Sequence, residues 1–239
     1  MIWKGRFTLG TAETDINSIA SPSVFLRYMQ DAANRQMAEF GPSYESLLEN
    51  GRSFLISRIT LNIPSVLYAH DEFECSSHAV PSKGASFERY CRISKNGETV
   101  AESAAVWALV DIKNGSLLRV RDVCSDYGAE PYPNDISPER FRIPDGILTN
   151  VGEHVVGYAD ADHNGHMNNA KYPDILCSFV GDMKNRRVHK MSLRFVTEAP
   201  LGEKLSVFSG ESDGVTYVRT VRCDGRVNAE AKITFTEMK

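Results

Sequence analysis

One order of elements, a helix followed by about four strands, occurs twice along the chain, and this repeat limits the folds that the chain can adopt. The first helix is predicted over residues 21–41, which open with Ser-Pro and close with Gly. The second is predicted over residues 169–183, where apolar side chains recur at helical spacing. Because Pro173 lacks an N–H, this second helix should begin no earlier than about Asn169.

The segments around the two helices are rich in β-branched and aromatic residues and are separated by turn signals, which is typical of strands. They cover residues 54–63, 71–80, 86–96, 98–112, 154–159, 189–199, 203–212, 215–225 and 227–238. A helix laid across a curved antiparallel sheet buries the apolar side of both, and two such sheets can join edge to edge. The sequence therefore predicts an α+β fold, a tandem double hotdog in which each half is a long helix packed on a curved antiparallel sheet.

The two repeats are separated by residues 126–147, which are rich in proline, glycine and charge and are interpreted as a linker. This divides the chain into an N-terminal hotdog domain, residues 1–125, and a C-terminal hotdog domain, residues 148–239. At 239 residues, the chain is long enough for one large domain or two fused smaller ones.

Charge and cysteine usage exclude several classes of function. The formal net charge of -4 and the pI near 5.9 argue against a nucleic-acid partner. Five scattered cysteines without a C-x-x-C pair indicate ordinary thiols in a reducing compartment. No signal-peptide core and no apolar run of membrane-spanning length is present. We therefore expect a cytoplasmic protein without a membrane partner; a homodimer is compatible with the sequence.

The stretch "DADHNGHMNNAK", Asp160–Lys171, opens like the calcium-binding loop of an EF-hand. That loop needs a bidentate carboxylate at its twelfth position, where this chain has Lys171, and it needs a helix before it, where this chain has the strand-like "HVVGYA". His163 and His166 suggest zinc only weakly, because no third ligand is evident, and His163 is interpreted as solvent-exposed. We predict no metal and no cofactor.

The same stretch carries a polar cluster that has no counterpart before the first helix. If the segment is extended, Asp162, Asn164 and His166 share one face. Asn168 and Asn169 can cap the helix that follows, and free N–H groups at its start suit a carbonyl that develops negative charge. Each residue also has a structural interpretation: Asp162 as a turn cap, Asn164 as a residue tolerant of left-handed φ, and His166 as a buried histidine.

The motif "DADHNGHMNNAKY", Asp160–Tyr172, resembles the D-x-D-x-N-x-H-x-N-N-x-K-Y signature of the acyl-acyl-carrier-protein thioesterases, and the resemblance suggests a bacterial-type member. It extends over nearly the whole chain, including "SFLISRITLNIP", "AAVWALVDIKNGSLLRV" and "SLRFVTEA". It implies that the catalytic residues are Asp162, Asn164, His166 and Glu198. The family's plant members have a cysteine where this chain has Ala199. Glu198 is otherwise interpreted as a surface charge at a strand end.

The resemblance implies hydrolysis of fatty acyl thioesters of acyl carrier protein by water, with Glu198 or Asp162 as the base. The acyl chain would lie in the first half, against Tyr28, Met29, Ala33 and Trp107, although packing of a core explains the same side chains. Arg186 and Arg187 lie in the basic run "KNRRVHK", which is interpreted as either a solvated loop or a docking surface for the acidic carrier. The alternatives are an acyl-CoA thioesterase, a non-catalytic acyl-thioester-binding protein and a hydratase or dehydratase.

Overall fold

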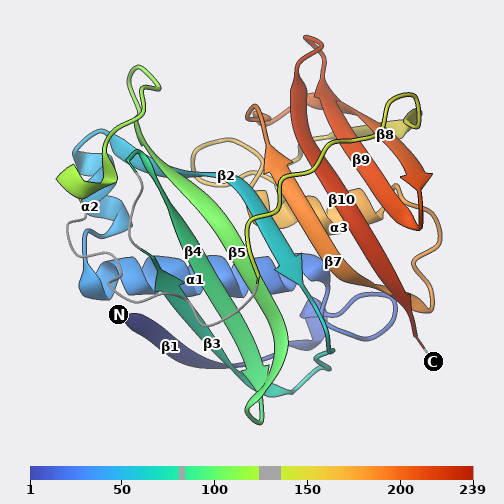
Figure 1. Cartoon of the computed structure of the whole chain (residues 1–239), viewed down its shortest axis with the longest axis horizontal. Helices are drawn as coiled ribbons and strands as arrows, with labels where there is room; N and C mark the ends of the chain where they lie inside the picture. The colour runs from blue at the N-terminus through green and yellow to red at the C-terminus, as the bar shows by residue number, and fades with distance from the viewer. Residues whose placement is uncertain (81–83, 124–135, 239) are drawn as a thin grey trace.

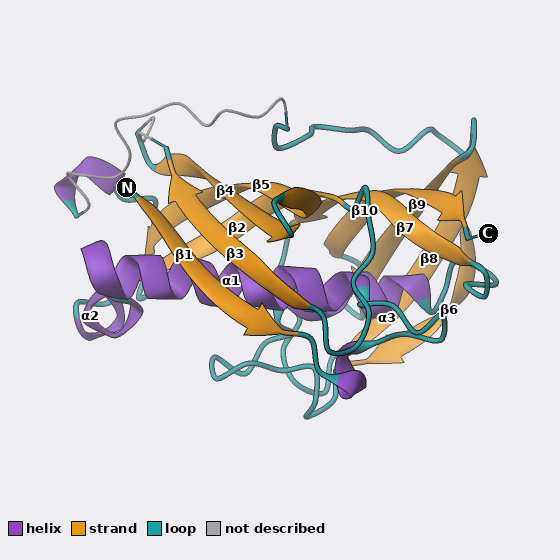
Figure 2. Ribbon diagram, turned by 90° about the horizontal axis from the view of Figure 1, so that it is seen from below, coloured by secondary structure: helices purple, strands orange, loops and turns teal. Residues whose placement is uncertain are grey.

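The computed structural model describes residues 1–80, 84–123 and 136–238, and these form one ten-stranded antiparallel sheet that curves around the main helix (Figure 1, Figure 2). The strands are β1 (Ile2–Thr8), β2 (Arg52–Asn62), β3 (Glu72–Ala79), β4 (Ser86–Lys95), β5 (Glu98–Asp111), β6 (Thr149–Val155), β7 (Arg186–Phe195), β8 (Lys204–Ser212), β9 (Val215–Arg222) and β10 (Val227–Glu237). The helices are α1 (Pro22–Phe40), α2 (Tyr44–Glu49) and α3 (Tyr172–Cys177), with short 3-10 turns at Thr11–Glu13, Val120–Asp122 and Asn169–Lys171. The fold is therefore α+β with one antiparallel sheet, as the sequence predicted.

The strand order of the second half repeats that of the first about the centre of the sheet. The order is β1-β3-β4-β5-β2 and then β7-β10-β9-β8-β6. β2 and β7 pair antiparallel, from Arg58 opposite Arg194 to Asn62 opposite Lys190. This junction joins the two half-sheets, so that only β1 and β6 are left as outer edges.

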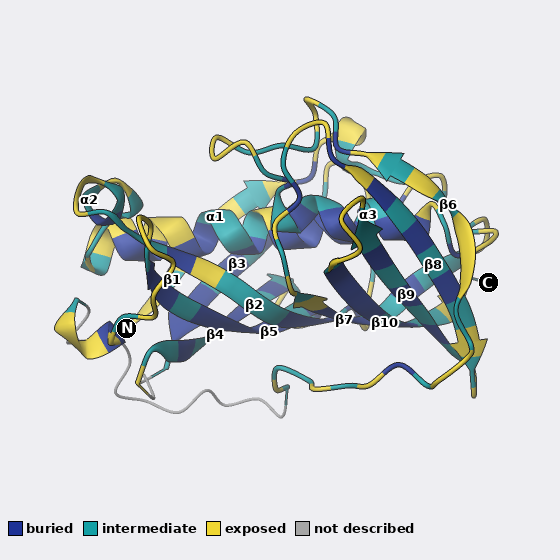
Figure 3. Cartoon of the chain, turned by 90° about the horizontal axis from the view of Figure 1, so that it is seen from above, coloured by how far each residue is buried: buried dark blue, intermediate teal, exposed yellow. Residues whose placement is uncertain are grey.

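The sequence patterns did not predict the strands at these two edges correctly. β1 was not predicted, and β6 covers Thr149–Val155 rather than residues 154–159. Both are edge strands whose residues are exposed or half-buried, and β6 is largely exposed in Figure 3. An edge strand that buries few side chains carries little of the apolar alternation from which strands are recognised. Each half therefore has five strands rather than about four.

The helix α1 agrees with its prediction and lies across the concave face of the sheet (Figure 2). Phe25, Met29, Ala32 and Met37 are buried along one side, which is the helical spacing of its sequence. It ends where Gly41, at φ +69°, donates its N–H to the carbonyl of Met37. Among the described residues, no helix is long and apolar enough to cross a membrane.

The second helix is much shorter than predicted, so the expectation of a long helix in each half is wrong for the second half. The α-helix covers only Tyr172–Cys177 and follows the 3-10 turn Asn169–Lys171, which agrees with a start no earlier than Asn169. Apolar spacing continues to Met183 because the chain beyond Cys177 stays packed on the core, not because it is helical. Gly181, at φ +87°, lies in the left-handed region that ends helices.

The first turns of α1 and α3 cap each other. The Asp174 carboxylate accepts hydrogen bonds from Ser23 N at 2.9 Å and from the Ser21 hydroxyl at 2.7 Å. In return, the Ser23 hydroxyl accepts a hydrogen bond from Asp174 N at 3.0 Å. An anionic side chain at a helix N-terminus also complements the helix dipole. These three residues therefore tie the two halves together on the helix side of the sheet.

Replacing Asp174 by alanine should remove this cap from α1 and lower the free energy of unfolding by about 1–2 kcal/mol, the usual value of an N-cap. Asp174→Asn should lose less, because an amide oxygen can still accept from Ser23 N. Urea unfolding followed by circular dichroism measures both. An Asp174→Ala protein as stable as the wild type would contradict the proposed capping.

Residues 136–148 cross the sheet on the face opposite the helices (Figure 1, Figure 2) and are fastened there by Glu139. Glu139 N donates to the Thr60 hydroxyl on β2 at 2.8 Å, and its carboxylate accepts from the Ser192 hydroxyl at 2.8 Å. Lys190 on β7 and Lys232 on β10 form ion pairs with the same carboxylate. Burial raises the pKa of Glu139, but the hydrogen bonds from Lys232, Lys190 and Ser192 outweigh burial and lower the pKa to about 2.

A lowered pKa means that the Glu139 carboxylate stabilises the fold above its unfolded pKa and loses this effect as the pH falls toward 2. We expect Glu139→Gln to be about 1 kcal/mol less stable than the wild type at neutral pH. This difference should shrink through the range between pH 4.5 and 2. Thermal unfolding at a series of pH values tests this, with Glu153→Gln, on the exposed ion pair with Lys204, as the matched control. A pH-independent difference would contradict it.

Candidate active site

The polar motif of the second half folds into a tight loop rather than an extended segment. Asp162 N donates to His166 O at 2.8 Å, and Gly165 N donates to Asp162 O at 3.0 Å. Gly165 has φ +74°, a conformation that favours glycine. The Asp162 carboxylate accepts from Asn164 N at 2.8 Å, which is an Asx turn. The prediction that the side chains of Asp162, Asn164 and His166 alternate on one face of a strand is therefore wrong.

A second segment, after β7, lies beside this loop. Met167 N donates to Ala199 O at 2.8 Å, and Leu201 N donates to Gly165 O at 2.9 Å. These bonds place the His166 side chain next to Glu198, with Nδ1 at 3.3 Å from Oε2. The two side chains keep 36% and 59% of their surface exposed, so water and substrate can reach both. Of the four predicted catalytic residues, the structure thus brings together His166 and Glu198.

The segment that carries Glu198 rests on a buried hydrogen-bond network. Asn228 on β10 is fully buried, and its amide nitrogen donates to Thr197 O at 2.6 Å. Its amide oxygen accepts from the Thr220 hydroxyl at 2.8 Å. The Tyr172 hydroxyl and the Asn228 amide are also hydrogen-bonded, at 3.0–3.1 Å. Neither Asn228 nor Thr220 is singled out by sequence reasoning, because each is an ordinary polar residue in a strand.

Asp162 shapes the loop, and Asn164 lies at its tip. Asp162 is half-buried in its Asx turn, and Asn164 is exposed at the tip. The N–H groups expected to be free at the helix start are partly occupied, because Asn168 itself accepts from Ala170 N and Lys171 N. The Asp160 carboxylate accepts from Gly157 N and pairs with His154 Nε2. Among the described residues, no three His, Cys, Asp or Glu side chains gather as a metal site requires.

The motif loop also contacts the first half of the chain. His163 is exposed, but its Nε2 lies 2.6 Å from the hydroxyl of Tyr44 on α2, and the two rings pack edge to face at 5.3 Å. The sequence prediction of a solvent-exposed His163 misses this contact, since the two residues are 119 positions apart. It holds the loop against α2.

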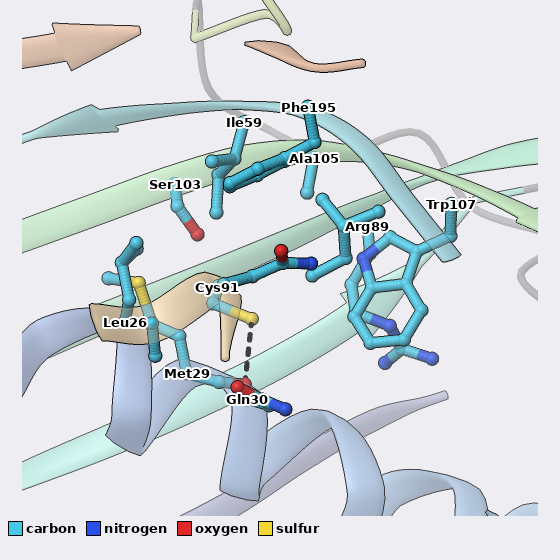
Figure 4. A pocket seen from close by; sticks show the side chains of 13 residues that line it. Leu26, Met29, Gln30, Ile59, Arg89, Cys91, Ser103, Ala105, Trp107 and Phe195 are labelled. Atoms are coloured by element: carbon cyan, nitrogen blue, oxygen red, sulfur yellow. Dashed lines mark hydrogen bonds between the residues drawn. The ribbon is translucent and has the colours of Figure 1, made fainter. Parts of the chain in front are cut away.

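A narrow pocket lies between α1 and the first half of the sheet (Figure 4). Its lining is largely apolar and comes from α1, β2, β4 and β5. Asn169 and Ala170, three and four residues after His166, complete its wall, as does Phe195 at the end of β7. The pocket therefore extends along the first half and ends beside the motif of the second half.

Two of the four residues predicted to bind the acyl chain line this pocket. Met29 and Trp107 do so, whereas Tyr28 and Ala33 do not. Tyr28 lies on the side of α1 that packs against β1 and β3, with its hydroxyl donating to Glu13 at 2.9 Å. Ala33 is fully buried. Tyr28 directly precedes Met29, and Ala33 follows it by one helical turn. The resemblance alone did not separate the pocket side of α1 from its other sides.

Arg186 and Arg187 begin β7 and do not lie in a solvated loop. The Arg186 guanidinium donates to Val180 O and lies over the ring of Phe235, with its central carbon 4.1 Å from the ring centroid. Arg187 donates to the carbonyl oxygens of Ile63 and Pro64, at 2.6 and 3.0 Å. Both side chains therefore hold parts of the fold together, and the neighbouring Lys184 is the exposed cation of this run.

The cysteines in the described part of the chain are poor nucleophiles. Burial raises the pKa of Cys75, Cys91 and Cys177, in the case of Cys177 to about 12. Cys223 is exposed, and a hydrogen bond with Glu203 raises its pKa. Cys124 lies outside the described residues. A catalytic cysteine needs the opposite shift, toward the thiolate.

Replacing all five cysteines by serine should therefore leave kcat within about tenfold, less than the usual contribution of a catalytic group. Iodoacetamide should likewise leave the activity in place, unless it alkylates Cys91, which lines the pocket and would block it. The Cys91→Ser protein separates the two effects. Complete loss of activity traced to a cysteine outside the pocket would overturn this expectation.

Comparisons with known proteins identify the family of the chain. Residues 1–127 match the acyl-ACP thioesterase N-terminal domain family, and residues 149–237 match the acyl-ACP thioesterase C-terminal domain family. The chain belongs to the acyl-ACP thioesterase family. Its members hydrolyse fatty acyl thioesters of acyl carrier protein, and this chain is a thioester hydrolase of that class. No curated protein sequence matches it.

Solved structures show the same fold. An acyl-ACP thioesterase from Bacteroides thetaiotaomicron superposes with a TM-score of 0.88 at 20% identity, over 98% of each chain. A 12:0-ACP thioesterase from Umbellularia californica superposes with a TM-score of 0.83 at 15% identity, over 99% of this chain and 97% of the other. The fold of this acyl-ACP thioesterase is thus the double hotdog.

Proposed function

We propose that His166 and Glu198 activate the water that hydrolyses the acyl thioester. The observation that carries this proposal is their contact at 3.3 Å on an accessible surface, next to the pocket that Asn169 and Ala170 complete. A thioester carbonyl is reactive enough that one base, one proton donor and a polarising group suffice. The acyl chain would lie in the pocket along α1, with its carbonyl toward the motif loop.

In this mechanism Glu198 is the base. It accepts a proton from water while the water oxygen attacks the carbonyl carbon. His166, oriented through Nδ1 by Glu198, can give a proton from Nε2 to the departing sulfur, so that a free thiol leaves. Asp162 holds the loop through its Asx turn, and Asn164 at the loop tip polarises the carbonyl. We also infer that each half is one hotdog unit fused in tandem, because the strand order of the first half recurs in the second.

A thiol-release assay tests this function directly. Purified protein is given fatty acyl thioesters of acyl carrier protein and of coenzyme A, and free thiol and free fatty acid are measured. We expect both products, with a lower KM for the carrier-bound substrate, since docking of a folded partner adds contacts that coenzyme A lacks. A hydratase or dehydratase would change the acyl chain and release no thiol, and a binding protein would release neither product.

A further inference from the structure

The pocket along α1 is lined by a tryptophan whose polar group has no partner in the described part of the chain. Trp107 on β5 is 7% exposed and lines the pocket, and its indole nitrogen is buried without a hydrogen-bond partner among the described residues. Figure 4 shows the nitrogen edge of this indole directed toward the other side chains of the pocket. Tryptophan Nε1 can only donate, and a buried indole N–H normally finds an acceptor.

The side chains that contact the ring of Trp107 offer no acceptor for this N–H. Phe54 and Phe87 pack on the ring of Trp107, with ring centroids 6.3 Å away in each case. Neither phenyl side chain has an oxygen or nitrogen atom that could accept a hydrogen bond. The Arg89 guanidinium lies over the ring, 5.4 Å from its centroid, and is itself only a donor. These neighbours leave the N–H without an acceptor, and an oxygen atom of whatever fills the pocket can take that place.

A saturated hydrocarbon chain cannot do so. It would displace water from the pocket and leave the indole N–H unpaired, which is a penalty that apolar contact only partly offsets. An acyl chain with an oxygen atom at the right carbon would accept a hydrogen bond from the indole N–H and leave no unpaired donor. The Ser103 hydroxyl and the Gln30 amide also line the pocket, so an oxygen-bearing acyl chain would meet further polar groups there.

We propose that this enzyme prefers fatty acyl groups that carry a hydroxyl or oxo substituent, and that the Trp107 N–H recognises this oxygen. The inference rests on the proposed function, because it places the acyl chain of the thioester in this pocket. It concerns which acyl group is accepted. Trp107 is therefore a specificity-determining residue, separate from His166 and Glu198.

Matched substrates test the preference. Acyl carrier protein is loaded with one saturated medium-length chain, either unsubstituted or with a hydroxyl group placed at successive carbons, and kcat/KM is measured for each. For one hydroxyl position we expect a kcat/KM about 5- to 50-fold above that of the unsubstituted chain, which is the effect of one otherwise unpaired buried donor. A higher kcat/KM for the unsubstituted chain than for every hydroxylated chain would overturn the proposal.

Trp107→Phe keeps an aromatic ring and removes the donor, and its smaller side chain is the same for both kinds of substrate. In this variant the ratio of kcat/KM between hydroxylated and unsubstituted chains should fall to within about twofold of one, because the hydrogen bond that sets it is gone. Trp3→Phe is the matched control, since Trp3 is the other tryptophan of the chain and packs on Phe7 and Arg35 at the edge strand β1. It should leave the ratio unchanged. If Trp107→Phe left this kcat/KM ratio unchanged, the N–H would have no role in selecting the acyl chain.

A binding measurement separates this inference from the hydrolytic function. In Trp3→Phe the fluorescence comes from Trp107 alone, and free hydroxylated and unsubstituted fatty acids can be titrated against it. Tighter binding of the hydroxylated acid supports the inference even if no thioester is cleaved, whereas equal or weaker binding overturns it even in an active enzyme.

Discussion

Replacing either His166 or Glu198 by alanine is expected to lower kcat for hydrolysis of the acyl thioester on acyl carrier protein by about 10²- to 10⁴-fold. This is the usual contribution of a positioned acid or base. The two side chains form one unit, because the Nδ1 of His166 lies 3.3 Å from the Glu198 carboxylate. Without Glu198 the imidazole loses the group that orients it, and without His166 the leaving sulfur loses its proton donor. The double variant should therefore lose little more than either single variant.

The measurement is kcat from thiol release at saturating substrate, with circular dichroism to show that each variant is folded. Glu153→Ala removes an exposed carboxylate from the edge strand β6 and is the matched control, which should keep the wild-type kcat. Retention of kcat within tenfold of wild type in either alanine variant would show that the pair is not catalytic.

The choice of base between Glu198 and Asp162 can be decided with isosteric amides. Asp162→Asn keeps an oxygen that accepts from Asn164 N, so the Asx turn survives. If Asp162 only shapes the loop, this variant should stay within a few-fold of wild type, while Glu198→Gln falls by at least about 10²-fold. The reverse order of effects would make Asp162 the base.

The largest expected loss of stability follows from Asn228→Ala. Asn228 is fully buried, and its amide is hydrogen-bonded to Thr197 O, the Thr220 hydroxyl and the Tyr172 hydroxyl. Alanine would leave these groups buried without that partner, and we expect the free energy of unfolding to fall by about 2–4 kcal/mol, since each unmet group costs about 1–3 kcal/mol and some relaxation follows. Because Thr197 precedes Glu198, kcat should fall as well.

Tyr172→Phe provides the graded comparison for Asn228. It removes one hydroxyl from the network but leaves the bond from Asn228 to Thr197 O in place. Its stability should drop by only about 1 kcal/mol, and its kcat should stay close to wild type. Urea unfolding and thiol release at one temperature, where both variants are folded, measure the two effects. A larger loss of kcat in Tyr172→Phe than in Asn228→Ala would contradict a role of Asn228 in holding the Glu198 segment.

Much of the fold follows from local patterns in the sequence. The helix α1 was predicted within a residue or two of its ends, because a Ser-Pro start, helical apolar spacing and a terminal glycine act together over one short segment. Most interior strands were predicted for the same reason, since they alternate or bury long apolar runs. The motif Asp160–Tyr172 indicated that the second half is the catalytic one. Glu198 was singled out only through the resemblance to a family, because no local pattern marks it.

The geometry of the site and the pocket was decided only by the tertiary structure, because it depends on contacts between distant segments. The pairing of His166 with Glu198 comes from the hydrogen bonds of Met167 and Leu201 across two loops, and neither segment encodes it alone. The pocket combines α1 and the first half of the sheet with Asn169 and Ala170 from the second half. Edge strands were missed or misplaced, and α3 is shorter than the helix predicted over residues 169–183, because hydrophobic periodicity reports how much of a segment is buried. An edge strand buries little, whereas a buried coil can bury as much as a helix.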